Sequence, residues 1–503
     1  MTESFKIIRN GLLPDDKTGR PERRDILVQD NLIVEIGVHG MDAPIGAEEI
    51  DAEGFLLMPG LVNAHSHGHG ALGRGLGDRW TLEHLLHAGP WMNGGRELED
   101  MALTARLNAA EMLLNGCTSV YDLYFEFPGP TIQTIDAVAG AYEEVGVRSV
   151  IAPMMADLSL YQALPELLAA LPEDKRARFE NVRMAPTETL LSTCRELLSN
   201  WRFDTRRTKI ALAPTIPLHC TEEFLIGCRD LSAEFEVGLH MHLAESRIQA
   251  VTGMQRYGQT LTSYLDGLGM LSERFTGAHC VWMDDDDLRR MGDNGASIAH
   301  NPGSNMRLGN GISPARRSLA AGVNLGIGTD GSSCSDDQNM FISMRLASFA
   351  SRIVSPDTSD WLSTREVLDA ATKGSAKALG FGDSIGRIKA GAEADIVFLD
   401  LDSIGFVPLN DPVNQIVHAQ DSSSVRHVMV AGEIVLKDRK FTRIDFSRLR
   451  HEAQTAADRL LANQSELRDF ASSLNKYVSG FCVGMAQTPY HVDRWCNHHS
   501  HSQ

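Results

Sequence analysis

Short apolar runs separated by polar turns lie near both ends of the chain. Near the N-terminus, two such runs flank the polar pair Asp30-Asn31, a pattern that predicts a β-hairpin. Short apolar runs separated by polar turns occur again at residues 394–402 and 425–438. Neither part has enough strands to bury a sheet face alone. We therefore expect one small β-sandwich domain assembled from residues 1–60 and 385–440.

Between these segments, strand-like runs alternate with helical patterns. The runs are Phe55–His67, 118–124, 147–153, 208–214, 237–245, 276–281, 296–302 and 324–330. Counted in this way, eight βα units predict an α/β protein with a (β/α)8 TIM-type barrel over residues 61–384. Residues 441–503 first show helical periodicity and then a polar, histidine-containing end. They predict a C-terminal helical extension with a disordered tail.

Chemically versatile side chains recur where the predicted strands end. The sequence His65-Ser66-His67 follows an apolar run, and residues i and i+2 of a strand point to the same side, so both imidazoles can face one metal ion. Four further polar residues end later strands: His242, Glu245, His279 and Asp330. In a TIM-type barrel the carboxyl ends of the strands carry the chemistry. We expect these six residues on one rim.

Composition narrows the class of protein. Apolar residues make up 43% and charged residues 22%, which is typical of a globular chain. The formal net charge of -19 opposes binding to nucleic acid and to anionic membranes. No apolar run approaches transmembrane length, and the first residues do not resemble a secretory signal. We expect a cytoplasmic protein whose scattered cysteines are reduced.

Five motifs in order give the chain a specific resemblance. They are PGLVNAHSH ending at 67, HLAE at 242–245, AHC at 278–280, HNPGSNMRLGNG at 300–311 and GTDGS at 328–332. In these motifs the chain resembles the amidohydrolase superfamily, in the mononuclear branch of deaminases and chlorohydrolases. That branch includes S-adenosylhomocysteine, guanine and cytosine deaminases and triazine hydrolases. With the GRIKAGAEADIV segment at 386–397, the resemblance covers nearly the whole chain.

The resemblance implies a ligand set and a catalytic set. It makes the metal ligands His65, His67, His242 and Asp330. His240 lies two residues earlier on the same strand face and is the alternative to His242, but the HLAE motif favours His242. Glu245 would move protons between water and leaving group, and His279 would polarise the substrate or help to deprotonate water. Asp330 would hold the metal and accept a proton.

The resemblance also bears on the number of metal ions. Binuclear relatives use a bridging carboxylated Lys or Glu on the fourth strand, whereas Lys209 stands at the beginning of that strand here. We therefore expect one divalent metal, Zn²⁺ or else Fe²⁺, with one position left for water.

The substrate pocket is where the chain departs from the family pattern. Thr215 stands where nucleoside-type deaminases carry a histidine, and Arg74-Gly75 lacks the acidic residue that follows in ribose binders. Both departures weigh against an adenosine-type substrate. The residues expected to line the pocket are Arg74, Trp80, Trp91, Thr215, His219, Asn301 and Asn305.

The sequence therefore predicts a metal-dependent hydrolase that displaces an amino or similar group from a small heteroaromatic molecule such as a purine, pterin, pyrimidine or triazine. Two alternatives use the same site, namely dechlorination and hydrolysis of an acyclic amide, carbamate or thiocarbamate. A catalytically silent scaffold is a third reading, which the complete ligand set disfavours. We also expect a homo-oligomer, a dimer or larger.

Overall fold

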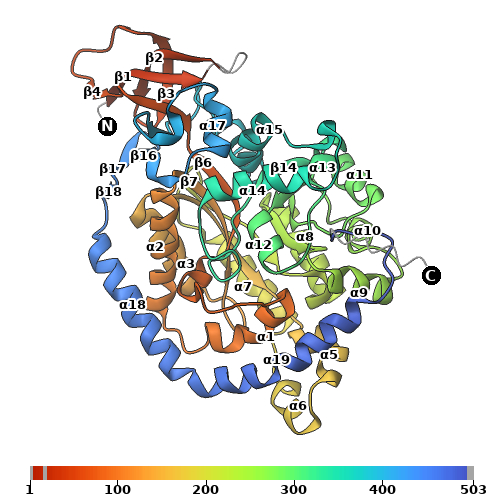
Figure 1. The fold of residues 1–503 in the computed structure, drawn as a ribbon. Coiled ribbons are helices and arrows are strands. Elements are labelled where there is room, and N and C mark those ends of the chain that lie inside the picture. The colour runs from red at the N-terminus through yellow and green to blue at the C-terminus, as the bar shows by residue number, and fades with distance from the viewer. Residues whose placement is uncertain (1–3, 15–19, 496–503) are drawn as a thin grey trace.

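One sheet combines strands from both ends of the chain. The computed structural model describes residues 4–14 and 20–495, and Figure 1 shows their arrangement. The strand order of this nine-stranded sheet is β18-β17-β16-β15-β5-β1-β2-β3, and β4 pairs with β1. Its strands are β1 (Phe5–Pro14), β2 (Pro21–Gln29), β3 (Leu32–Val38), β4 (Glu48–Asp51), β5 (Phe55–Pro59), β15 (Ile396–Asp400), β16 (Val425–Val430), β17 (Glu433–Lys437) and β18 (Lys440–Phe441).

The two halves of this sheet meet between β5 and β15, which run antiparallel. Successive side chains of β15 point to opposite faces of the sheet, so both faces pack against apolar residues. Ile396 and Phe398 pack in one cluster with apolar side chains of β1 to β3, whereas Val397 and Leu399 join the large core shared with the rest of the molecule. Both ends of the chain therefore contribute to one continuous buried interior.

Two parallel sheets form the centre of the molecule. The first contains β6 (Leu61–Ser66), β7 (Cys117–Phe125), β8 (Arg148–Met155), β9 (Thr208–Ile210) and β10 (Ala213–Pro214). The second contains β11 (Leu239–Leu243), β12 (Phe275–His279), β13 (Ser297–His300) and β14 (Asn324–Ile327). A parallel bridge between Leu212 and Leu239 joins the sheets on one side. On the other side the Asp330 amide donates to the carbonyl of His65 at 2.9 Å.

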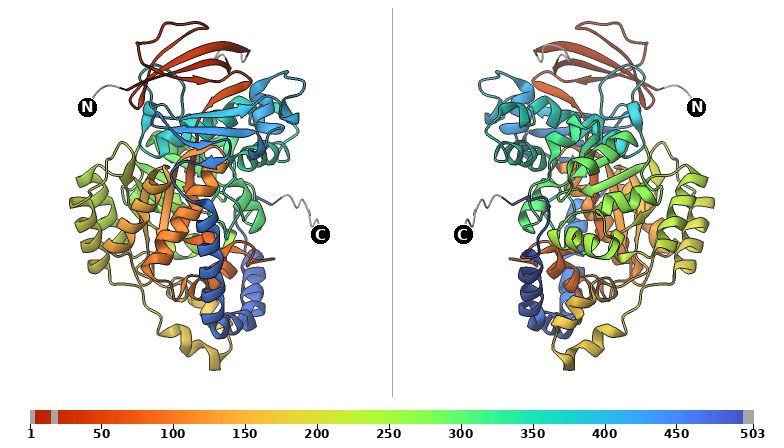
Figure 2. Two further views of the ribbon diagram at one scale, coloured as in Figure 1. Left: turned by 90° about the vertical axis from the view of Figure 1, so that its left-hand side faces the viewer. Right: turned by 90° about the vertical axis from the view of Figure 1, so that its right-hand side faces the viewer.

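Helices cover these strands from outside, as the two side views in Figure 2 show. Those that follow the strands are α1 (Leu82–Asn93), α2 (Leu98–Leu114), α3 (Ile132–Val145), α7 (Thr187–Ser199), α8 (Glu222–Phe235), α9 (Arg247–Tyr257), α10 (Leu261–Gly267), α11 (Asp285–Asp293), α12 (Pro302–Arg307), α13 (Ala315–Ala320), α14 (Met340–Arg352), α15 (Thr364–Asp369), α16 (Ser375–Ala378) and α17 (Pro412–His418). The predicted α/β class is confirmed, and the fold is TIM-barrel-like.

The sequence pattern differs from the structure at two strands. The apolar run Phe55–His67 is divided at Gly60, so that β5 belongs to the nine-stranded sheet and β6 to the first parallel sheet. A Cβ at Gly60 would lie 2.1 Å from Thr118 Oγ1, which explains why a glycine stands at the crossing. The fourth predicted strand, residues 208–214, is also interrupted, between β9 and β10.

Two further groups of helices reach the end of the molecule opposite the nine-stranded sheet (Figures 1 and 2). The first is α4 (Leu160–Ala163), α5 (Pro165–Ala170) and α6 (Glu173–Glu180), and the second is α18 (Phe446–Asn463) and α19 (Ser465–Ala486). Leu164, Phe179 and Leu474 share one buried cluster, so α19 packs on the first group. The histidines at 498, 499 and 501 lie outside the described residues. No helix in the described part of the chain is long and apolar enough to cross a membrane.

Candidate metal centre and substrate cavity

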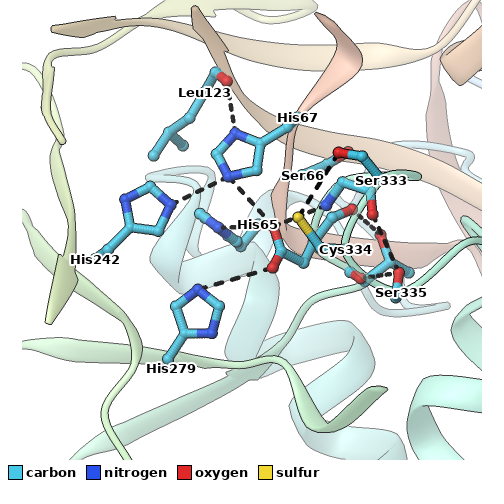
Figure 3. Close-up of polar contacts among 12 residues, drawn as sticks. His65, Ser66, His67, Leu123, His242, His279, Ser333, Cys334 and Ser335 are labelled. Atoms are coloured by element: carbon cyan, nitrogen blue, oxygen red, sulfur yellow. Dashed lines mark hydrogen bonds and ion pairs between the residues drawn. The ribbon is translucent and has the colours of Figure 1, made fainter. Parts of the chain in front are cut away.

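Three imidazoles have a hydrogen-bonded Nδ1 and an Nε2 that faces the centre of the site; Figure 3 shows the one at His67. His67 Nδ1 donates to the carbonyl of Leu123 at 2.8 Å, and His242 Nδ1 donates to the carbonyl of Thr215 at 2.7 Å. His279 Nδ1 contacts Asn305 Oδ1 at 2.8 Å. A carbonyl or amide oxygen accepts only from a protonated nitrogen, so each contact presents the lone pair of Nε2 to the interior of the site.

Asp330, which follows β14, brings a carboxylate to the same point. Its Oδ1 lies 3.2 Å from His67 Nε2 and 3.6 Å from His65 Nε2. His67 Nε2 and His242 Nε2 are 3.1 Å apart. Two nitrogens on one tetrahedral Zn²⁺, each about 2.1 Å from the ion, would be about 3.4 Å apart. The four groups are therefore spaced as ligands of one ion would be.

Buried atoms without partners support the same conclusion. His65 Nε2, His279 Nε2 and Glu245 Oε2 find no hydrogen-bond partner among the described residues, although all three side chains are fully buried. Buried polar atoms rarely remain unpaired, so these three atoms are suited to contact a metal ion or a water molecule. A divalent metal with one water fits these residues: His65, His67, His242 and Asp330 supply the donors, and Glu245 and His279 face the remaining space.

His240 occupies a different place from His242. Its Nε2 contacts Nδ1 of His65 at 3.2 Å, on the side of the His65 ring away from Asp330. The ring of His240 packs edge-on against Tyr121, with centroids 4.5 Å apart. His240 therefore supports His65 from behind, as hydrogen-bonded partners of metal-binding histidines commonly do. His242 Nε2, in contrast, lies 3.1 Å from His67 Nε2.

Glu245 and His279 stand beside this centre and are each held by an asparagine. Glu245 Oε1 accepts a hydrogen bond from Asn310 Nδ2 at 3.0 Å, while Oε2 lies 3.7 Å from His279 Nε2. Asn305 orients His279 through its Nδ1. Sequence reasoning placed Asn305 in the pocket wall and did not single out Asn310. Both belong to the segment HNPGSNMRLGNG, whose spacing alone does not reveal which side chain each asparagine meets.

The two carboxylates of the site have opposite electrostatic surroundings. Burial raises the pKa of Glu245 well above its ordinary value, and the nearby charge of Asp330 adds to the effect. Burial also raises the pKa of Asp330, but the hydrogen bond to His65 and the charges of His67 and His279 outweigh it and hold the pKa well below the usual range. Neighbouring carboxyl groups with divergent pKa values commonly divide into a proton carrier and a permanent anion.

The strand ends that carry these groups have unusual backbone geometry. Ala244, His279, Cys280 and Asp330 all have positive φ, at 48°, 69°, 48° and 64°. Non-glycine residues in this region are strained by about 1–3 kcal/mol each and cluster at functional sites. The backbone therefore bends sharply at the ends of β11, β12 and β14. These bends direct the side chains of Glu245, His279 and Asp330 toward one point.

A cavity of about 410 Å³ opens directly on the centre and is lined in part by His67, His242, Glu245 and Asp330. Of the expected pocket residues, Thr215 and His219 line it. Burial lowers the pKa of His219 to about 4, so this imidazole is neutral at physiological pH. Most other lining residues are apolar, among them Leu86, Phe125, Leu160, Tyr161, Phe179 and Met184.

The other expected pocket residues lie elsewhere. Arg74 pairs with Glu111 and is half exposed. Trp80 and Trp91 pack edge to face, with centroids 6.4 Å apart, beneath α19. Asn301 is buried close to Gly328, where a Cβ would lie 2.3 Å from its Oδ1. The apolar walls come instead from α1 and from the segment around α4 to α6, which has no motif in the sequence.

Comparison with known proteins agrees with this geometry. The Amidohydrolase family matches residues 56–435. The chain is 30% identical to a 5'-deoxyadenosine deaminase of Methanosarcina mazei, over 91% of this chain and 98% of that protein. It is 32% identical to an 8-oxoguanine deaminase of Pseudomonas aeruginosa, over 90% of this chain and 99% of that protein.

Solved structures show the same relationship. A zinc-bound adenosine deaminase from Xanthomonas campestris superimposes with a TM-score of 0.80 at 28% identity, covering 91% of this chain and 98% of its own. Atrazine chlorohydrolase from Arthrobacter aurescens, complexed with zinc, gives a TM-score of 0.80 at 28% identity and covers 90% and 99%. The resemblance seen in the motifs is confirmed, and this chain belongs to the amidohydrolase family.

Proposed function

We propose that this protein is a metal-dependent hydrolase that displaces an amino or similar leaving group from a neutral heteroaromatic ring bearing apolar substituents. One observation carries the proposal: four prospective metal ligands, Glu245 and His279 converge at the inner end of a largely apolar cavity. The named relatives include deaminases of purine compounds and a triazine chlorohydrolase. A silent scaffold would have no need of this convergence. Closure of the two parallel sheets as an eight-stranded barrel is part of the proposal.

Zinc is the metal we propose, because its tetrahedral preference suits three imidazoles and one carboxylate and leaves room for water. Two of the solved relatives contain zinc. When bound, such an ion supplies water as a nucleophile at neutral pH, since coordination lowers the pKa of water to about 7. Lys209 lies away from this centre, with its ammonium on the carbonyl of Gly380 and 4.3 Å from the centroid of the Phe381 ring, which favours a single ion.

The chain's own groups then divide the remaining work. Glu245 Oε2, which has no other partner among the described residues, takes a proton from the nucleophile and returns it to the leaving group. Asn310 keeps Glu245 oriented through Oε1. His279, which Asn305 orients so that its Nε2 lone pair faces the site, assists deprotonation; to polarise the C=N bond it would first have to be protonated at Nε2. Asp330 serves as an anionic ligand, since its lowered pKa makes it a poorer proton acceptor than Glu245.

The cavity wall indicates what surrounds the reacting ring. Among the described residues that line it, the charged side chains are Arg96, Glu245 and Asp330. Both terminal nitrogens of Arg96 already donate to backbone carbonyls, those of His69 and Met92. The two carboxylates belong to the centre. A charged substituent held against the apolar walls, away from Arg96, would therefore lose water without gaining partners, whereas alkyl groups would bury apolar surface.

The leaving group is set by the substrate, since the same centre could release ammonia, an alkylamine or chloride. Acyclic amides, carbamates and thiocarbamates remain the alternative substrate class. Purified protein should be tested against purines, pterins, pyrimidines, triazines and thiocarbamates for release of ammonia, amine or chloride. Turnover restricted to acyclic compounds would contradict the proposal.

The substituent preference can be measured with a matched pair of substrates. We expect an aminotriazine with two ethylamino groups to have a kcat/KM about 100-fold or more above that of the analogue in which one ethyl group is replaced by carboxymethyl. An unpaired buried carboxylate costs several kcal/mol, and about 1.4 kcal/mol corresponds to each factor of ten. Comparable or higher kcat/KM for the carboxymethyl compound would refute this assignment of the cavity.

One substitution should weaken that preference. Leu86→Lys places an ammonium in the cavity wall and should raise the relative kcat/KM of the carboxymethyl analogue about tenfold or more, because the new charge pairs with the carboxylate. Leu98→Lys is the matched control, since Leu98 is exposed at the start of α2 and does not line this cavity. An equal shift in both variants would indicate a general charge effect.

A further inference from the structure

A short segment after α19 returns to the site. Residues 488–495, here called the C-terminal strap, contact the loops that follow β11, β12 and β13. We propose that the strap positions Glu245 for proton transfer by fixing the backbone around Asn310. The inference rests on the proposed role of Glu245, and it concerns residues beyond the matched family region, which ends at 435.

The strap forms two hydrogen bonds with the segment that carries Asn310. Trp495 Nε1 donates to the carbonyl of Gly309 at 3.1 Å, and the amide of Ile312 donates to the carbonyl of Arg494 at 3.0 Å. Gly311 makes this approach possible. Its φ is 116°, and a Cβ there would lie 2.8 Å from the carbonyl oxygen of Arg494. Asn310 is thus fixed from both neighbouring sides.

A tryptophan links the strap and the Asn310 segment to the turn that follows His279. Trp282, three residues after His279, donates from Nε1 to the carbonyl of Asn310 at 2.8 Å and packs edge-on against Trp495, with centroids 5.1 Å apart. Arg494 donates to the carbonyls of Val281, at 3.0 Å, and of Met283. The turn that follows His279 is therefore bonded to the strap on both sides of Trp282.

The loop after β11 is tied to the same assembly. Arg247, two residues after Glu245, places its guanidinium 5.1 Å from the ring centroid of Trp282 and 5.2 Å from that of Trp495. It also donates to the carbonyl of Thr488 at 2.9 Å. Cation–π contacts of this kind are strongest when desolvated. The path from the strap to Glu245 then closes through Asn310 Nδ2, which donates to Oε1.

The inference predicts a loss of rate without loss of metal. On the full chain, Trp495→Ala should lower kcat for the bis(ethylamino)aminotriazine about tenfold while KM changes by less than about twofold, since a misoriented proton carrier slows chemistry more than binding. Bound metal should stay at the wild-type level. Trp201→Ala is the matched control: its indole also donates to a backbone carbonyl, that of Thr208 at 2.9 Å, and packs on Phe203. It should leave kcat unchanged.

A double substitution separates positioning from general stability. If the strap acts through Asn310, then Trp495→Ala combined with Asn310→Ala should be about as slow as Asn310→Ala alone. Purely structural effects would multiply. Rates that multiply, or a Trp495→Ala enzyme with wild-type kcat alongside an inactive Glu245→Gln enzyme, would overturn the inference. A fully active Glu245→Gln enzyme would instead overturn the proposed function.

A second measurement does not depend on turnover. Amide hydrogen exchange at residues 309–313 should become faster in Trp495→Ala than in the wild-type protein, because the bonds from the strap to Gly309 and Ile312 are weakened. The same peptides should be unaffected in Trp201→Ala. Unchanged exchange in Trp495→Ala would contradict the inference even if the rate fell.

Discussion

Glu245→Gln should retain its metal and lose nearly all turnover. Glutamine is nearly isosteric with glutamate, and its Oε1 can still accept the hydrogen bond from Asn310 Nδ2. What disappears is the carboxylate oxygen that faces His279 and the reacting water. A positioned proton carrier typically contributes about 10²- to 10⁴-fold, so kcat should fall by that factor or more. Metal content and kcat should be measured on the same preparation.

Glu83 offers a matched control for this substitution. Its carboxylate is also buried and accepts from Ser246 Oγ at 2.9 Å, next in sequence to Glu245, but it does not line the cavity. Glu83→Gln should affect kcat far less than Glu245→Gln. Full activity of Glu245→Gln would mean that another group carries the proton, and our reading of the β11 end would be wrong.

His242→Ala should lose metal and activity together. Loss of a hydrogen-bonded partner behind a ligand typically weakens metal binding about 10- to 100-fold, so removal of a ligand itself should weaken it further. His240→Ala provides the comparison, because His240 contacts the rear of the His65 ring and not the side that faces Asp330. That variant should bind metal more weakly than wild type and still fill its site when metal is in excess.

Metal analysis of both histidine variants at a defined free metal concentration decides which histidine binds the metal. The outcome that contradicts the geometry is a His242→Ala protein with full metal beside a His240→Ala protein that cannot be loaded. In that case His240, and not His242, would be the metal ligand on β11.

Periodicity predicted most of the parallel strands, since they are short apolar runs, and the motifs indicated which strands are followed by polar residues. They also indicated that the two chain ends belong together, because neither has enough strands to bury a sheet face alone; the structure joins them in one nine-stranded sheet, and the sandwich stays a prediction. The division of the run Phe55–His67 was not predictable from hydrophobicity, because the apolar residues of β5 continue across Gly60 into Leu61 and Val62 of β6. It depends on a close contact between Gly60 and Thr118.

The residues that line the cavity were harder to predict from the sequence than the residues of the metal centre. Residues at strand ends are brought together by the sheet register, so their meeting point follows from the strand assignments. The walls depend on how irregular segments pack: Phe179 and Leu160 reach the cavity only because α19 supports α4 to α6. Trp80 and Trp91 looked suitable for stacking on a ring, yet they pack on each other and on Ala471.

Titration of the metal-free protein with Zn²⁺ tests the central claim most directly. Activity on the aminotriazine should rise in proportion to added metal and reach its plateau at one equivalent per chain, in the wild-type protein and in Lys209→Ala alike, because Lys209 lies at the far end of the strand. Activity that is independent of metal, or a plateau at two equivalents that falls to one in Lys209→Ala, would contradict the single-metal hydrolase described here.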